Sequence, residues 1–159
     1  MSANYSYAAA VGTLTASGTF TDTQTVVVGG KTYTTQTSLT NVDGNVLIGA
    51  DAAATLQNLY DAINLTGTAG TQYAAAMTAN TRVKATAVTA TTLVVRALTP
   101  GEVGNLIAST ETQTNAAWGA ATLASGAGNF TAWVAALEAG TQINSEVLAA
   151  LHALDATAN

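Results

Sequence analysis

The chain has no cysteine, a single histidine and only four cationic residues. It can therefore build neither a disulfide framework nor a thiolate or histidine-cluster metal site. Four cations are too few to neutralise a track of phosphates, so we expect no nucleic-acid partner. His152 is expected to be solvated or to lie at an interface, and no neighbouring carboxylates suggest acid–base chemistry. The sequence thus predicts a protein that is not an enzyme and needs no metal or organic cofactor.

Long apolar runs are also missing. No uninterrupted apolar stretch approaches the roughly 20 residues that a membrane-spanning helix needs. Residues 1–7 have neither the basic nor the apolar region of a signal peptide. We therefore expect a protein that is made and folded in a cytoplasm and has no membrane partner.

The residues that are abundant point to a small packed domain. Of 159 residues, 48% are hydrophobic, mainly Ala and Val, whereas aromatic residues make up 6%. Charged residues make up 8%, against about 25% in an average protein, so Thr, Ser, Asn, Gln and Gly must cover the surface. Disorder goes with the opposite composition. Such a weakly repulsive surface suits a protein whose neighbours cover it.

Strand-like patterns dominate residues 11–39 and return after residue 81. The clearest signal is Gly29-Gly30 between two Thr- and Val-rich runs, which predicts a β-hairpin with a two-residue turn. In its second arm the alternation predicts a half-buried strand that continues to residue 39. One face of that strand carries Tyr33, Thr35, Thr37 and Leu39.

Further strands are expected in the second half. Val83, Ala85 and Ala87 alternate with polar residues, so all three are predicted to face inward. Residues 92–98 predict a more buried strand, followed by a turn at Pro100 and Gly101. Two more strands are expected over residues 105–112 and 117–124.

Residues 51–64 form the best helix candidate. Asp51 is a natural N-cap because its carboxylate can accept the unpaired amide hydrogens of the first turn. Leu56, Leu59, Tyr60 and Ile63 follow at helical spacing and form one apolar stripe. The glycines at 67 and 70 are expected to end the helix.

The composition divides the chain into three parts: an N-terminal arm (residues 1–10), a β-rich domain (11–126) and a C-terminal helical appendage (127–159). The appendage predicts two short amphipathic helices, which could fold back on the domain or reach a partner. The arm could anchor on a neighbour or remain a frayed terminus. The candidate partner-binding residues are Tyr5, Tyr7, Phe130, Trp133, Val134, Leu137, Val147, Leu148, Leu151 and Leu154.

Three motifs resemble known kinds of site. Residues 41–45 resemble an acidic calcium loop, but Val46 and Ala52 stand where that loop needs Gly and Glu, so a turn is favoured and an irregular calcium site is left open. A phosphate-binding loop ending at Lys31 fails because Thr25 replaces the required glycine. An isopeptide bond from Lys31 or Lys84 to an Asn is a further option that the spacing does not favour.

Several strings within residues 12–126 resemble a recurrent β-rich module of tailed-bacteriophage virion proteins, found in head-decorating, tail and fibre proteins. They are Gly12-Thr13-Leu14-Thr15, the hairpin over residues 25–34, residues 46–59, Ala62-Ile63-Asn64, Thr99-Pro100-Gly101, Gly104-Asn105 and residues 118–123. The resemblance implies no catalytic residues.

Pattern and resemblance together predict an α+β fold. We expect an antiparallel, sandwich-like sheet packed on one amphipathic helix, plus the helical appendage. The expected function is that of a virion structural subunit, of the capsid decoration or cement type or tail-associated. Its partners would be other virion proteins and further copies of itself. The alternative is a receptor- or glycan-binding module of a tail fibre, with Trp118 and Trp133 as candidate aromatics.

Overall fold

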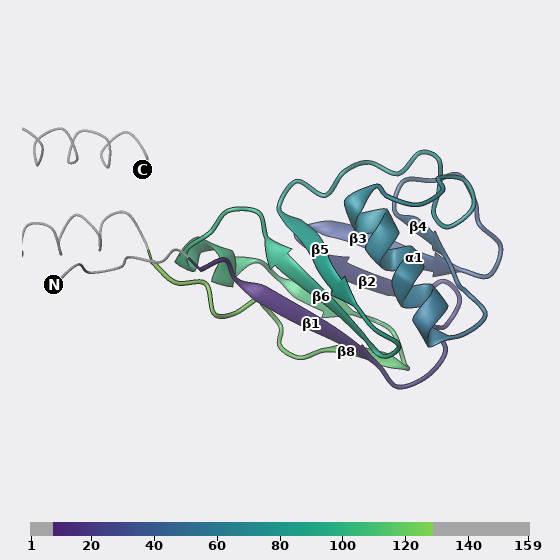
Figure 1. The fold of residues 1–159 in the computed structure, drawn as a ribbon. Coiled ribbons are helices and arrows are strands. Elements are labelled where there is room, and N and C mark those ends of the chain that lie inside the picture. The colour runs from purple at the N-terminus through teal and green to yellow at the C-terminus, as the bar shows by residue number, and fades with distance from the viewer. Residues whose placement is uncertain (1–7, 129–159) are drawn as a thin grey trace, which may run out of the picture.

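The computed structural model describes residues 8–128, which form two four-stranded β-sheets and one α-helix (Figure 1). The strand order is β5-β6-β1-β8 in one sheet and β4-β3-β2-β7 in the other. The elements are β1 (Val11–Ala16), β2 (Thr25–Val28), β3 (Lys31–Gln36), β4 (Asn45–Leu47), α1 (Ala52–Asn64), β5 (Val83–Val88), β6 (Thr92–Ala97), the 3₁₀ helix η1 (Glu102–Leu106), β7 (Ser109–Glu111) and β8 (Ala116–Trp118). The expected α+β class is confirmed.

The two sheets share one core. Helix α1 packs on β5 and β4, the edge strands at one side of the sheets, while β7 and β8 come together on the other side. Leu14 of β1, Val26 of β2, Tyr33 of β3 and Leu93 of β6 are fully buried, so both sheets contribute to the same apolar interior. The described part of the molecule is therefore a sandwich with a helix along one side.

Helix α1 forms where the sequence predicts it. The Asp51 carboxylate accepts a hydrogen bond from the amide of Ala54 at 2.8 Å, which is the expected N-cap. Leu56, Leu59 and Ile63 are buried, whereas Tyr60 is half-buried. The helix ends earlier than the two glycines, because Leu65 takes the left-handed conformation at φ 53° and closes the last turn.

The hairpin is confirmed in register and in turn. Strands β2 and β3 pair antiparallel, with Val26 opposite Tyr33 and Val28 opposite Lys31. Both turn residues have positive φ, 64° at Gly29 and 79° at Gly30, which is the geometry that favours glycine. The second arm is shorter than expected, since β3 ends at Gln36 and the chain then turns away.

The short strand β4 departs from the expected antiparallel arrangement. It pairs parallel with β3, and Asn45 lies opposite Thr34. The remaining strand pairs in both sheets are antiparallel. A three-residue strand has too few residues for its pattern to indicate a direction, so this pairing depends on contacts distant in the sequence.

Three details of the second half also differ. Ala87 is exposed rather than inward, because the register of β5 against β6 shifts between Ala85 and Ala87. The strand expected over residues 105–112 begins instead as η1 and reduces to β7. The strand expected over 117–124 reduces to β8, followed by isolated bridges such as that between Val11 and Ala124.

Both ends of the described chain lie together at one end of the sandwich, next to η1 (Figure 1). Ala8 and Ala127 exchange two backbone hydrogen bonds of 3.0 Å. The amide of Asn105, in η1, donates to the carbonyl of Gly126 at 3.0 Å. The segments before residue 8 and after residue 128 therefore leave the sandwich from the same end.

Candidate functional site

All ten candidate partner-binding residues lie outside the described residues. They are Tyr5, Tyr7, Phe130, Trp133, Val134, Leu137, Val147, Leu148, Leu151 and Leu154, and they remain predictions. The site must therefore be sought on the sandwich itself. The sandwich carries three candidate features: a polar cluster beside the hairpin, a hollow beside Trp118 and an exposed strand face.

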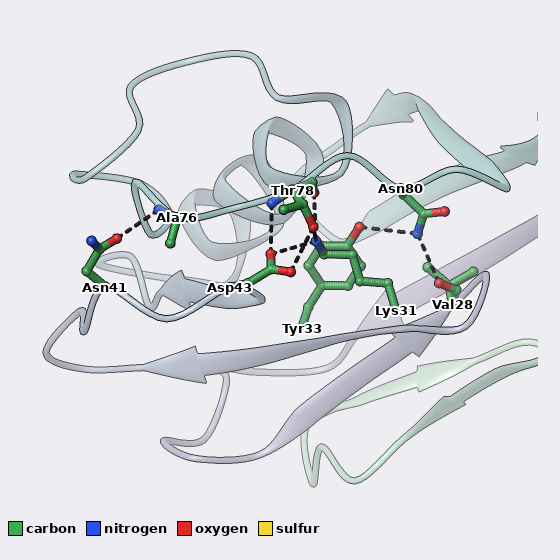
Figure 2. Close-up of polar contacts among 8 residues, drawn as sticks. All are labelled: Val28, Lys31, Tyr33, Asn41, Asp43, Ala76, Thr78 and Asn80. Carbon is green, nitrogen blue, oxygen red and sulfur yellow. Dashed lines mark hydrogen bonds and ion pairs between the residues drawn. The ribbon is translucent and has the colours of Figure 1, made fainter.

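The polar cluster, which we call the clamp, joins Lys31, Asp43 and Thr78 (Figure 2). The ammonium of Lys31 at the start of β3 lies 2.7 Å from Oδ1 of Asp43 and donates to the carbonyl and the hydroxyl of Thr78 at 2.6 and 2.7 Å. Asp43 in turn accepts the backbone amide of Thr78 at 2.8 Å and its hydroxyl at 2.7 Å. The clamp thus ties the loop between α1 and β5 to the β3–β4 connection.

The electrostatics of the clamp do not suit catalysis. The hydrogen bond from Lys31, followed by that from the Thr78 amide, lowers the pKa of Asp43 to about 2. A carboxylate with so low a pKa is a weak base near neutral pH. Lys31 already donates to three oxygens, so its hydrogen-bonding capacity is used within the clamp.

A buried polar pair extends the clamp into the core. The amide of Asn80 donates to the carbonyl of Val28 at 3.0 Å and to the hydroxyl of Tyr33 at 3.3 Å (Figure 2). Its carbonyl accepts the backbone amides of Arg82 and Val83. Burial is the main cause that raises the pKa of Tyr33 to about 12. This pair fixes the entry into β5 against the hairpin.

The clamp also bears on the calcium and isopeptide options. The side-chain oxygen of Asn41 accepts the amide of Ala76 at 2.8 Å, and both oxygens of Asp43 accept hydrogen bonds within the clamp. These oxygens hold the loop by hydrogen bonds to Ala76 and Thr78, in agreement with the turn that the sequence favours. Lys31 contacts Asp43 and Thr78 rather than an Asn side chain, and Asp43 is ionised, whereas amide formation needs an uncharged acid and amine.

A hollow of about 320 Å³ lies beside β7 and β8 and is lined by Ser109, Thr110, Glu111, Trp118, Ala120 and Ala121. Trp118 is only 9% exposed, and its indole nitrogen donates to the carbonyl of Thr110 at 3.2 Å. Its ring belongs to the core. It therefore does not offer the exposed flat surface on which a sugar would stack.

The outer face of the sheet β5-β6-β1-β8 carries exposed cationic and apolar side chains. Lys84, Arg96 and Val11 lie in one cross-strand row, and all three side chains are exposed. Beyond this row, Arg82 and Leu98 are also exposed, and the amide of Leu98 donates to the carbonyl of Arg82 at 2.9 Å. We call this surface the basic face. It consists of Val11, Arg82, Lys84, Arg96 and Leu98, together with Val103 of η1, which borders the same hollow as Arg82.

The basic face continues onto η1 at the end of the sandwich. A second hollow, of about 140 Å³, is lined by Thr81, Arg82, Thr99, Val103, Gly104 and Ile107, so Val103 and Arg82 border the same depression. Val103 is 55% exposed, and the neighbouring Leu106 is 75% exposed. Large apolar side chains thus gather where the chain leaves the sandwich.

Among residues 8–128, the cations of the basic face have no carboxylate partner. Residues 8–128 form a single ion pair, between Lys31 and Asp43, and it lies in the clamp. The side chains of Arg82, Lys84 and Arg96 make no ion pair or hydrogen bond in that range. Like charges directly opposite each other on a sheet are destabilising, so the row of Lys84 and Arg96 has a cost for which the described residues show no compensation.

Sequence reasoning did not identify the basic face. Alternation placed Lys84 outward on β5, but the pattern could not show that β6 lies beside β5 with Arg96 opposite Lys84. The signal that was available is compositional: three of the four cations of the chain fall within residues 82–96.

In the part of the chain that the structure describes, no three His, Cys, Asp or Glu side chains gather closely enough to hold a metal ion. None of the helices formed by residues 8–128 is long and apolar enough to cross a membrane.

Comparison with known proteins gave no match: neither a family model, nor a curated protein, nor a solved structure is similar to this chain.

Proposed function

We propose that this protein is a structural subunit of a tailed-bacteriophage particle, of the head decoration or cement type or tail-associated, which stabilises the particle by covering and being covered by neighbouring subunits. The kind of particle is inferred from the resemblance of residues 12–126 to modules of virion proteins. Stabilisation by contact between subunits is supported by the exposed side chains on the surface of the sandwich. A neighbour would bury the exposed apolar side chains and the basic face.

One observation carries the mechanism: Leu98, Val103 and Leu106 are all about half exposed or more. Leu98 directly follows β6, and Val103 and Leu106 belong to η1, which is hydrogen-bonded to Gly126 near the end of the described chain. Monomeric proteins rarely expose large contiguous apolar patches, and such patches commonly mark contact surfaces. The clamp, by contrast, is satisfied within the domain and holds the scaffold in shape. Exposed apolar side chains are therefore present near the end from which the terminal segments leave.

The glycan-binding alternative loses its described aromatic candidate. Trp118 is buried and hydrogen-bonded in the core, so a Trp118→Ala variant would lose stability whether or not the protein binds sugars. Trp133, the other candidate, lies outside the described residues. No observation on the sandwich favours this alternative.

The test is incorporation into particles. Full-length and 129–159-deleted chains would be expressed separately in a host that produces the phage, and purified particles would be probed for the protein. We expect the full-length chain to co-purify with particles and the deleted chain to remain in the soluble fraction. A Thr32→Glu variant, changed on the other sheet, serves as the control and should be incorporated normally.

Two results would contradict the proposal. If the full-length chain is absent from particles, the virion role is wrong. If the deleted chain is incorporated as well as the full-length chain, the terminal segment does not dock the subunit.

A further inference from the structure

The C-terminal segment and the basic face are complementary in charge and in polarity. Residues 129–159 contain Glu138, Glu146 and Asp155 and no Lys or Arg, so all four cations of the chain lie within the sandwich. The segment also contains the apolar residues Phe130, Trp133 and Leu137 at helical spacing. Acidic charge and apolar bulk are the two properties that would match the basic face.

The basic face has the properties of an uncovered contact surface. Its three cations lack partners among residues 8–128, and Val11, Leu98 and Val103 add apolar area beside them. An acidic, apolar segment would neutralise the row of Lys84 and Arg96 and remove these apolar side chains from water. Complementary potentials of this kind determine which surfaces associate.

We propose that residues 129–159 of one copy dock on the basic face of the next copy. This inference rests on the proposed role as an assembling subunit, which requires contacts between copies. The contact joins two different surfaces, so each docked copy still offers its own face and its own segment. Copies can then add head to tail, and added salt weakens the contact because the attraction is largely between charges.

The experiment uses two charge-reversed full-length chains. In the face-reversed chain, Arg82→Glu, Lys84→Glu and Arg96→Glu make the face negative. In the segment-reversed chain, Glu138→Lys, Glu146→Lys and Asp155→Lys make the segment positive. Sedimentation velocity over a range of protein concentrations measures association of each chain alone and of their equimolar mixture.

We expect the unaltered chain to self-associate. Each reversed chain alone should associate at least about tenfold more weakly, because face and segment then have the same sign. In the mixture every face again meets a segment of opposite sign, so association should return to that of the unaltered chain. Loss in both single chains and recovery in the mixture is specific to this contact.

Milder variants guard against misfolding. Arg96→Gln removes one charge from the face and should weaken association by about threefold. Thr32→Glu changes the net charge by the same amount on the outer side of the other sheet and should leave association unchanged. Circular dichroism of all variants checks that the sandwich is intact.

The proposal is overturned by any of three results: an unaltered chain that stays monomeric, reversed chains that associate normally, or a mixture that does not recover. A monomeric chain in which face reversal changes Trp133 fluorescence would mean that the segment covers its own domain instead. Because purified protein suffices, these outcomes are independent of incorporation into particles.

Discussion

At the scale of single residues, the two lysines of the chain have opposite roles. Lys31 is largely buried, with 13% of its side chain exposed, and it donates to three oxygens in the clamp. Lys84 is exposed opposite Arg96 and makes no ion pair with residues 8–128. The same residue type therefore fixes a loop at one position and presents a charge at the other.

Lys31→Ala should destabilise the protein by about 1–2 kcal/mol, because the oxygens of Asp43 and Thr78 lose a charged donor. Lys84→Ala is the matched control and should change the free energy of unfolding by less than about 0.5 kcal/mol. Urea unfolding followed by circular dichroism measures both. Equal effects of the two substitutions would mean that the clamp contributes nothing to stability.

Tyr33 makes the stability of the fold depend on pH in the alkaline range. Its pKa is raised to about 12 from its ordinary value of 10.0, mainly by burial, so folding favours the neutral phenol. The stability that this difference supplies is complete below pH 10.0 and is lost as the pH rises toward 12.

We therefore expect the unfolding free energy to fall between pH 10.0 and 12, and to fall less steeply in Tyr33→Phe. A difference titration of tyrosinate absorbance between the two proteins should place the pKa of Tyr33 near 12. Ionisation of Tyr33 near its ordinary value would contradict the burial argument.

At the scale of elements, the β2–β3 hairpin shows how a local signal and a distant contact combine. Both Gly29 and Gly30 have positive φ, which the turn itself requires. A Cβ added at Gly30 would meet open space, whereas one at Gly29 would lie 2.8 Å from the side-chain oxygen of Asn80. Asn80 is held by its bonds to Val28, Tyr33 and β5, so it cannot easily move.

Gly30→Ala should therefore show the backbone strain alone, about 1 kcal/mol. Gly29→Ala should cost at least about 1 kcal/mol more, because Asn80 must shift and weaken its buried hydrogen bonds. Thermal unfolding of the two variants checks the difference. If both lose the same stability, the contact between the turn and Asn80 is unimportant.

The elements also differ in how far the sequence predicted them. Helix α1 and the hairpin were predicted closely, because an N-cap, a helical stripe and a two-glycine turn are local patterns. The parallel direction of β4, the bulge after Ala85 and the reduction of residues 105–112 to η1 and β7 were not predicted. Each of these three features depends on which distant segment of the chain lies next to the strand.

At the scale of the whole molecule, the core joins segments from the entire described range. Strand β1 near the beginning lies between β6 and β8, with Leu14 opposite both Leu93 and Trp118. The sandwich cannot close before these late strands exist. We therefore expect residues 8–128 to unfold as one cooperative unit.

Two leucines separate core from contact surface in a single experiment. Leu14→Ala should destabilise the protein by about 2–5 kcal/mol, because Leu14 is fully buried. Leu106→Ala should change stability by less than about 0.5 kcal/mol, because that side chain is 75% exposed. Denaturant midpoints give both values, and a large loss in Leu106→Ala would show that η1 is part of the core rather than a contact surface.

The sequence by itself determined the composition of the surface, the capped helix and the hairpin, because these follow from residue type, spacing and turn chemistry over a few neighbouring positions. Only the tertiary structure decided that Lys31 meets Asp43 and Thr78, that β4 runs parallel to β3, and that Lys84 lies opposite Arg96. Strands with polar, Thr-rich outer sides specify their pairing weakly. Which strands become neighbours is settled by burial of the shared core, and that choice places the cations of the basic face together.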